Sequence, residues 1–108
     1  MTDPIVRTEF SLALPSGERR TVTLCIGQPY RASTGEWRCP IALEGLQDRL
    51  ADAAGEDAFQ SLSLALRLLM SQLEAVVQRG GKVFYPNSEL EVPLEAYVQS
   101  GISLGRPA

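Results

Sequence analysis

One stretch of the chain decides the fold: residues 57–77, DAFQSLSLALRLLMSQLEAVV. Its apolar residues recur at steps of three and four, the period of a helix that covers a hydrophobic core. The stripe expected to face the core contains Phe59, Leu62, Leu66, Leu69, Leu73 and Val76, with Val77 beside it and with Ala65 and Met70 at its margins. Asp57 and Gln60 are spaced as an approximate capping box, and Gly80 suits the left-handed residue that ends a helix. The stretch therefore predicts one long amphipathic helix that begins near Asp57.

Two alternating runs precede this helix and predict a β-hairpin. They are residues 5–14, IVRTEFSLAL, and residues 19–30, RRTVTLCIGQPY, with a Pro-Ser-Gly turn between them. A third run, residues 36–45, EWRCPIALEG, also alternates. Its Pro40 cannot donate a ladder hydrogen bond, so this strand is expected at a sheet edge or with a bulge. Residues 46–56 fit either a helix or a strand, and the flanking glycines favour a fourth strand that returns as a hairpin.

These elements predict an α+β fold. The expected architecture is an antiparallel sheet of about four strands, or five, with one long amphipathic helix packed on one face. Residues 82–85, KVFY, supply a short strand after the helix, and residues 86–97 an irregular or edge segment. Residues 1–97 are predicted to form a single α+β domain. Residues 98–108 are small, polar and rich in Gly and Pro, which is typical of a flexible tail.

Composition limits the class of protein. A chain of 108 residues with 44% hydrophobic and 21% charged residues suits one globular domain with a real core. The net charge of -3 and the lack of a long Lys or Arg run disfavour a nucleic-acid partner. The N-terminus lacks a signal-peptide pattern, and Ser, Arg and Gln interrupt the longest apolar stretch, so no membrane partner is expected. Two cysteines without an export signal favour a cytoplasmic, bacterial-type protein.

Several kinds of chemistry are missing from the sequence. There is no histidine, which removes Ser-His-Asp and Cys-His catalysis and His-ligated zinc. Cys25 and Cys39 match no CxxC spacing and fall on opposite faces of their strands, which favours buried, inert thiols. The RGGK segment at residues 79–82 lacks the spacing of a phosphate-binding loop. No catalytic residue, cofactor or metal ligand is therefore predicted, and an enzyme is the less favoured class.

The helix carries a second apolar strip. With Leu66 at the centre of the main stripe, Leu64 and Leu68 lie toward the opposite side, where a helix on a sheet should be polar. This strip is the candidate partner surface: Ser61, Leu64, Leu68 and Ala75. It predicts contact with a second copy or with another protein. Chance exposure, and cover by the C-terminal segment ELEVPLEAYV, are the open alternatives.

Two functions remain open at this point. The leading hypothesis is a non-enzymatic protein-binding or regulatory module that acts through its helix surface, for example by neutralising a toxin or as an accessory protein. The alternative is a small-ligand binder or modest enzyme with a pocket between helix and sheet. Tyr30, Trp37 and Tyr85 are the candidate pocket residues, since aromatic rings can stack on a ligand. Packing in the core and at the sheet edge is the more ordinary role of such residues.

Three segments carry a resemblance to a known family: GEWRCPIALEG, EDAFQSLSLALRLLMSQLEAV and GGKVFY. Together they resemble a family of small, functionally uncharacterised bacterial proteins, typically from proteobacteria, in which a Trp-containing strand leads through a hairpin into a helix opening D-x-x-Q-A-L-x-L-A-L. The matching residues are Trp37, Gly45, Asp57, Gln60, Leu62, Leu64, Ala65 and Leu66. Ser61 replaces the usual Ala of the family. The resemblance covers about residues 10–86. It implies a bacterial origin and one small domain, and it brings no activity, substrate or catalytic residue.

Overall fold

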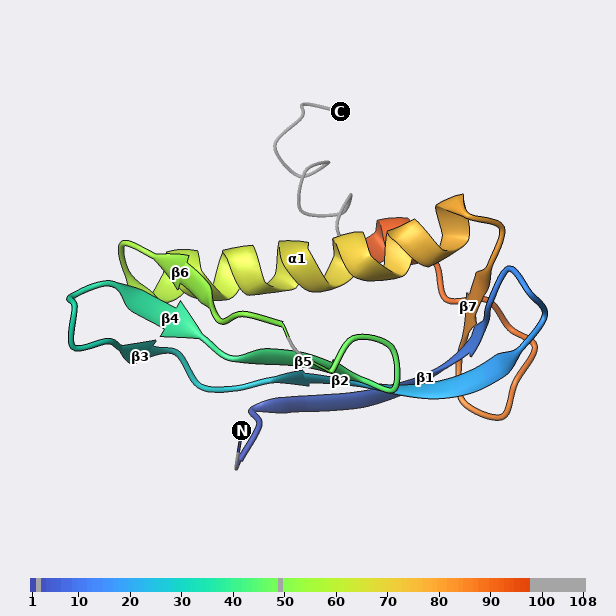
Figure 1. Ribbon diagram of the computed structural model, residues 1–108, viewed down its shortest axis with the longest axis horizontal. Helices are drawn as coiled ribbons and strands as arrows, with labels where there is room; N and C mark the ends of the chain where they lie inside the picture. Colours follow the sequence, from blue (N-terminus) through green and yellow to red (C-terminus); the bar gives the residue numbers. More distant parts are fainter. Residues whose placement is uncertain (2, 49, 98–108) are drawn as a thin grey trace.

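A computed structural model describes residues 1, 3–48 and 50–97 of the chain (Figure 1). In chain order its elements are β1 (Val6–Ala13), β2 (Arg19–Ile26), β3 (Tyr30–Arg31), β4 (Trp37–Cys39), β5 (Ile41–Glu44), β6 (Ala53–Gly55), α1 (Ala58–Gln78) and β7 (Lys82–Phe84). The predicted α+β class is confirmed. The tail predicted at residues 98–108 lies outside the described residues.

The main sheet is antiparallel and has the strand order β5-β2-β1-β7. Strands β1 and β2 form the predicted hairpin, with Val6 opposite Ile26 at its open end. Its loop has three residues and ends at Gly17, whose φ of 95° needs a residue without a Cβ. Local turn chemistry and period-two alternation are enough to produce this part of the fold.

A second, three-stranded sheet was not predicted. It has the order β3-β4-β6 and forms because the expected third strand divides at Pro40. Without an N–H this residue cannot continue a ladder, and its carbonyl instead accepts from Gly27 N at 2.8 Å. The part before Pro40 becomes β4 in the small sheet, and the part after it becomes β5 in the main sheet. Residues 46–56 do contain a strand, β6, but it pairs with β4 in the small sheet.

Helix α1 runs along the main sheet, with β4 and β6 beside its first half and β7 at its far end (Figure 1). The predicted N-cap is confirmed, since Asp57 Oδ1 accepts from Gln60 N at 2.7 Å. Gln60 reaches back to the backbone N–H of Glu56, at 2.6 Å, one residue before the expected partner. After the helix, Gly80 has a φ of 100°, as the sequence predicts for the residue that follows a helix end.

The buried face of α1 matches the predicted stripe only in part. Its buried residues are Ser61, Ala65, Leu69, Met70, Leu73 and Val76. Phe59 and Leu66 were expected in the core, but they are 78% and 48% exposed. At 100° per residue, the buried face is centred roughly 70° away from Leu66. The reason is that β6 approaches the helix closely at Gly55, and only small side chains fit under that contact.

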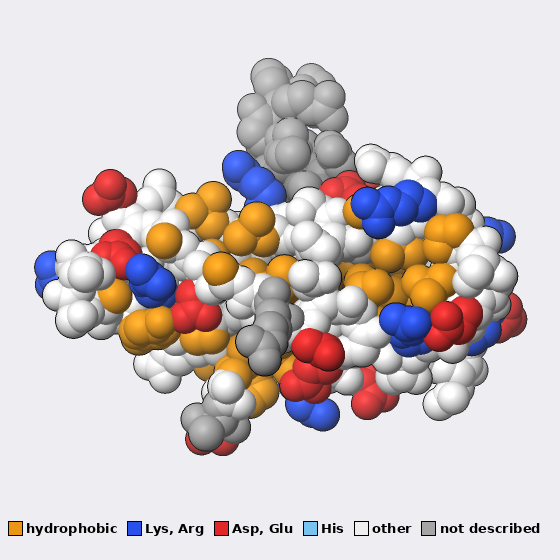
Figure 2. All heavy atoms as spheres, viewed as in Figure 1, with side chains coloured by type: hydrophobic (Ala, Val, Ile, Leu, Met, Phe, Trp, Pro, Cys, Tyr) orange, Lys and Arg blue, Asp and Glu red, His pale blue; other side chains and the backbone are white. Residues whose placement is uncertain are grey.

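The hydrophobic core lies between α1 and the inner face of the main sheet. Figure 2 shows hydrophobic side chains in the band between the helix and this sheet, on the face that it views. The segment after β7, expected to be irregular, contributes Val92 and Leu94 to the core, and Val92 N donates to Val83 O at 2.8 Å. Among the described residues, no helix has the length and apolar character needed to cross a membrane.

Candidate functional site

An apolar groove of about 690 Å³ lies between helix α1 and the first half of strand β1. It is called the α1–β1 groove below. The sheet face forms its floor, and the helix and Tyr97 form its walls. The lining residues are Val6, Thr8, Phe10, Leu24, Ile26, Ser63, Leu66, Arg67, Leu69, Met70 and Tyr97. Most of these side chains are apolar, so the groove offers a hydrophobic surface with a polar rim.

The groove exists because α1 does not cover the first half of β1. Phe10 and Leu12 are buried under the helix layer, whereas the four residues from Val6 to Glu9 are exposed. The helix lies close to β6, where the small side chains of Ser61 and Ala65 allow near contact. Its position on that side leaves the inner face of β1 open where the strand begins.

Large apolar side chains are exposed around this opening. Val6 is 40%, Leu66 48% and Tyr97 52% exposed, and all three line the α1–β1 groove. Phe59 lies two turns before Leu66 on the same helix face and extends the apolar surface. Exposed apolar groups that gather around a concavity commonly mark an interaction or ligand site. The groove is therefore the candidate functional site.

The polar groups of the groove are few. Arg67 supplies a positive charge, and Thr8, Ser63 and the Tyr97 hydroxyl supply hydrogen-bonding groups. A hydrogen bond with Tyr85 raises the pKa of Tyr97. These groups can orient a bound molecule through hydrogen bonds and charge.

The predicted partner surface does not form one accessible patch. Ser61 is fully buried, and its hydroxyl donates to Ala58 O at 2.8 Å. Leu64 is half-buried against the core, and Ala75 is also half-buried. Leu68 alone of the four is broadly exposed, at 45%. Ser61 was assigned to this strip because Leu66 was taken as the centre of the core face, whereas the buried face is centred closer to Ser61.

The predicted aromatic pocket is also not assembled. Tyr30 lies opposite Arg38 and Trp37 lies opposite Arg31, so the two rings project from opposite faces of the small sheet. Tyr85 follows β7, at the other end of the molecule (Figure 1). None of these three residues lines the α1–β1 groove, although Tyr85 bonds to Tyr97, which does. A pocket between helix and sheet does occur, with other residues around it.

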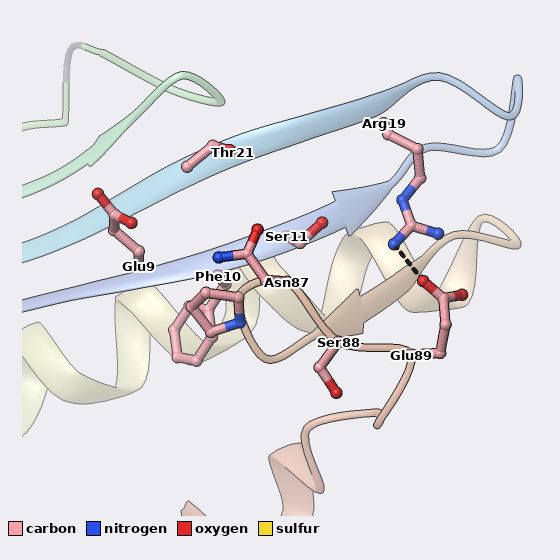
Figure 3. Close-up of a pocket in the computed structure, with 9 residues that line it drawn as sticks. Glu9, Phe10, Ser11, Arg19, Thr21, Asn87, Ser88 and Glu89 are labelled. Carbon is pink, nitrogen blue, oxygen red and sulfur yellow. Dashed lines mark hydrogen bonds and ion pairs between the residues drawn. The ribbon is translucent and has the colours of Figure 1, made fainter.

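A smaller polar recess of about 350 Å³ lies on the outer face of the β1–β2 hairpin (Figure 3). The turn after β7 brings Asn87, Ser88 and Glu89 over this face. Glu89 Oε2 accepts from Arg19 Nη2 at 3.0 Å, and the Arg19 guanidinium also stacks on the Phe84 ring, 4.5 Å from its centroid. These contacts tie the turn to the hairpin, which is a structural role.

A polar cluster stabilises the small sheet at the β3–β4 turn. Glu36 accepts hydrogen bonds from Thr34 Oγ1 and from the Arg38 guanidinium, whose Nη2 lies 2.6 Å away. These bonds lower the pKa of Glu36 to about 2. Tyr30 donates to Asp52, and this hydrogen bond raises the pKa of Tyr30. The carboxylates of Glu36 and Asp52 thus both accept hydrogen bonds within this cluster.

The described part of the chain contains neither a disulfide nor a cluster of metal ligands. Cys25 and Cys39 are buried and unbridged, as predicted, and burial raises the pKa of the Cys39 thiol. Within residues 1, 3–48 and 50–97, no three His, Cys, Asp or Glu side chains come together as metal ligands would. The α1–β1 groove, with its apolar lining and a few polar groups, is therefore kept as the candidate binding site.

Sequence reasoning missed the residues that form the groove. Leu66 and Phe59 were assigned to the core because they are large and in register with other leucines. Ala65 was placed at the margin of the core stripe but Ser61 outside it, although these two small residues lie one turn apart and follow Gly55. Small residues at helical spacing mark a close approach of backbone, and so mark the buried side.

A family model described as a domain of unknown function (DUF6968) matches residues 7–93. The matched region contains both sheets almost completely, the whole of α1 and most of the groove. Neither the curated proteins nor the solved structures include a match to the chain. The expected membership of a functionally uncharacterised family is confirmed, because the matched residues make up most of the chain. The chain belongs to the DUF6968 family, a family of unknown function.

Proposed function

We propose that this protein is a non-enzymatic protein-binding module whose binding surface is the α1–β1 groove. The observation that supports this most is the exposure of Val6, Leu66 and Tyr97 around one apolar concavity. The surface differs from the strip around Leu68 that the sequence favoured. The proposal includes a bacterial, cytoplasmic setting, supported by the family resemblance and by the two unbridged thiols.

The shape of the groove favours an extended polypeptide segment as its occupant. The sheet face forms the floor and the helix one wall, and alternate side chains of an extended segment would enter the apolar floor. Arg67 at the rim favours an acidic residue in that segment, because a carboxylate can pair with a guanidinium. The expected ligand is an apolar segment with one acidic residue, carried by a protein that this module regulates or assists.

The proposal can be tested with peptides selected from a random library displayed on phage. Selected sequences should contain apolar residues at alternate positions. A synthetic peptide from this set should bind the full chain in a fluorescence anisotropy titration. Leu66→Glu should weaken this binding by at least roughly tenfold, because it places a charge in the apolar groove.

Leu68→Glu is the matched control. Leu66 and Leu68 lie on the same helix and have nearly equal exposure, 48% and 45%, but only Leu66 lines the groove. The control should bind the peptide with unchanged affinity. Equal losses in both variants, or no selected peptides at all, would contradict the proposal.

A second candidate is a small apolar ligand with an acidic head group. The groove volume of about 690 Å³ lies within the usual range of ligand sites, and Arg67 could hold a carboxylate. Long-chain fatty acids are suitable probes. If this candidate is correct, they should raise the melting temperature of the folded chain, and Leu66→Glu should abolish that shift.

A further inference from the structure

The last residue that the structure describes, Tyr97, stands in the wall of the α1–β1 groove. It lies toward the Phe10 end, because it is hydrogen-bonded to Tyr85, which directly follows the residue paired with Ser11. From there the groove extends toward Val6, about 13 Å away along β1 at the usual rise of a strand. The chain that follows Tyr97 therefore starts beside the groove.

The next eight residues carry an alternating pattern. They are VQSGISLG, residues 98–105, called the 98–105 segment below. In an extended chain, alternate side chains fall on the same side. Val98, Ile102 and Leu104 would then share one side with a serine, and the other side would hold only Gln, Gly and Ser. The segment thus combines one apolar side with one polar or small side.

The composition of the segment favours this extended conformation over a helix. Gly101 and Gly105 disfavour a helix, because glycine loses the most backbone freedom on becoming helical. A helix would also bring only Val98 and Ile102 together and turn Leu104 to the opposite side. All three apolar side chains gather only in the extended form, which is the form that the groove is expected to bind.

The segment is also long enough to cross the groove. An extended chain advances about 3.3 Å per residue, so Ile102 can reach about 17 Å from Tyr97 and Leu104 about 23 Å. Both distances exceed the length of the floor between Phe10 and Val6. The apolar side chains of the segment can therefore be distributed along the whole floor.

The groove presents the apolar surface that these side chains need. Val6, Leu66 and Tyr97 line it and are all partly exposed to water. Contact with the apolar side of the 98–105 segment would remove both surfaces from water, which is favourable. A segment tethered at the groove wall also has an effective concentration on the order of 1 mM, so even weak contacts keep the groove occupied much of the time.

Charge distinguishes this segment from the ligand expected for the groove. Arg67 lines the groove, whereas residues 98–105 contain no Asp or Glu. An acidic residue in a partner's segment would gain an ion pair with Arg67 that the chain's own segment cannot make. A partner segment with an acidic residue therefore has the advantage needed to displace the 98–105 segment.

We propose that the 98–105 segment occupies the α1–β1 groove of the free protein, with Val98, Ile102 and Leu104 toward the floor, and that a partner segment with an acidic residue displaces it. The segment is then a built-in competitor, which lowers the affinity of the groove for apolar segments that lack the acidic residue. The displacement rests on the proposed function of the groove. The occupation of the groove does not, because it needs no partner.

The first test traps the occupied groove without any peptide. Ser63 is exposed and lines the groove, so the full-length variant Ser63→Cys/Leu104→Cys should form an intramolecular disulfide under mild oxidation. Leu68→Cys/Leu104→Cys is the matched control, because Leu68 is also exposed but lies on the opposite side of α1 from the groove. The Ser63 pair should close at least roughly tenfold faster, because docking raises the effective concentration of the two thiols. Mass spectrometry of tryptic peptides measures the rates, and the native Cys25 and Cys39 are buried.

The second test measures the competition. Ile102→Ser/Leu104→Ser removes two apolar side chains from the segment and adds no charge. The peptide selected for the groove should bind this variant roughly three to ten times more tightly than the wild-type chain, because a larger fraction of the grooves is open. Gln99→Ala/Ser103→Ala alters the other side of the segment and should leave the Kd of the peptide unchanged.

Two outcomes would overturn the occupation: equal disulfide rates for the Ser63 and Leu68 pairs, or the same peptide affinity in the wild-type chain and in Ile102→Ser/Leu104→Ser. Either result leaves the proposed function intact, provided that the peptide still binds in the groove. Failure of the proposed function gives a different pattern, in which no peptide binds either chain while the Ser63 pair still closes faster. That pattern overturns the displacement and supports the occupation.

Discussion

Gly55 of β6 lies directly against Ser61 of α1. A Cβ added to Gly55 would come within 2.7 Å of Ser61 N and 3.1 Å of the Gln60 carbonyl carbon, and no real side chain tolerates the first distance. The helix therefore touches the backbone of β6, and this contact orients α1. It turns Ser61 and Ala65 into the core and leaves Leu66 beside an open groove.

Gly55→Ala should destabilise the fold by about 1–3 kcal/mol, since the new methyl group must push the helix away from β6. Urea unfolding followed by circular dichroism measures this. Ala54→Val adds more atoms at an exposed position on the same strand and should change stability by less than about 0.5 kcal/mol. An equal effect of both substitutions would show that the close contact is not a constraint.

Leu69→Ala should cost about 2–5 kcal/mol, because Leu69 is buried and its removal leaves a cavity. Leu66→Ala should cost less than about 1 kcal/mol, because this side chain already contacts water. The same urea titration compares them. A larger loss at Leu66 would mean that α1 is oriented as the leucine periodicity alone suggests.

Glu36 should make the stability depend on pH in the acid range. Its pKa of about 2 in the folded chain lies below the ordinary value of 4.5, so its ionised form is favoured by folding. This contribution is complete above pH 4.5 and is lost as the pH falls toward 2. A carbon-detected NMR titration should give the low pKa directly, and Glu36→Gln should flatten the stability profile in this window.

Thr34→Val tests the cause of that shift. It removes the hydroxyl that donates to Glu36, the largest contribution to the lowered pKa, and keeps the shape of the side chain. The pKa of Glu36 should rise toward its ordinary value. An unchanged pKa would assign the effect to Arg38 and to the backbone hydrogen bond at Glu36.

The two thiols should be inert in the folded chain. Cys39 of β4 is fully buried, and its Sγ donates to Gly27 O. Cys25 of β2 is also buried. Ellman's reagent should label them slowly in buffer and rapidly in denaturant, because labelling requires opening of the fold. Rapid labelling of one equivalent in buffer would show that one thiol is accessible.

The sequence determined the elements whose signals are local. Alternation and a Pro-Ser-Gly turn were enough for the β1–β2 hairpin, and Asp57 and Gly80 were enough for the two ends of α1. The burial of the two thiols was also predicted from the sequence. Pro40 also predicted an interruption of the third strand, since a residue without an N–H cannot donate to a ladder. The sequence did not reveal that the two parts of this strand belong to different sheets.

Only the tertiary structure decided which face of α1 is buried and where a binding surface lies. Helical periodicity defines a broad apolar stripe, but many rotations of that stripe bury similar apolar area. The choice between them came from the contact of Ser61 with Gly55, which are near in sequence but belong to different layers. The groove follows from that choice and is not encoded in a local pattern.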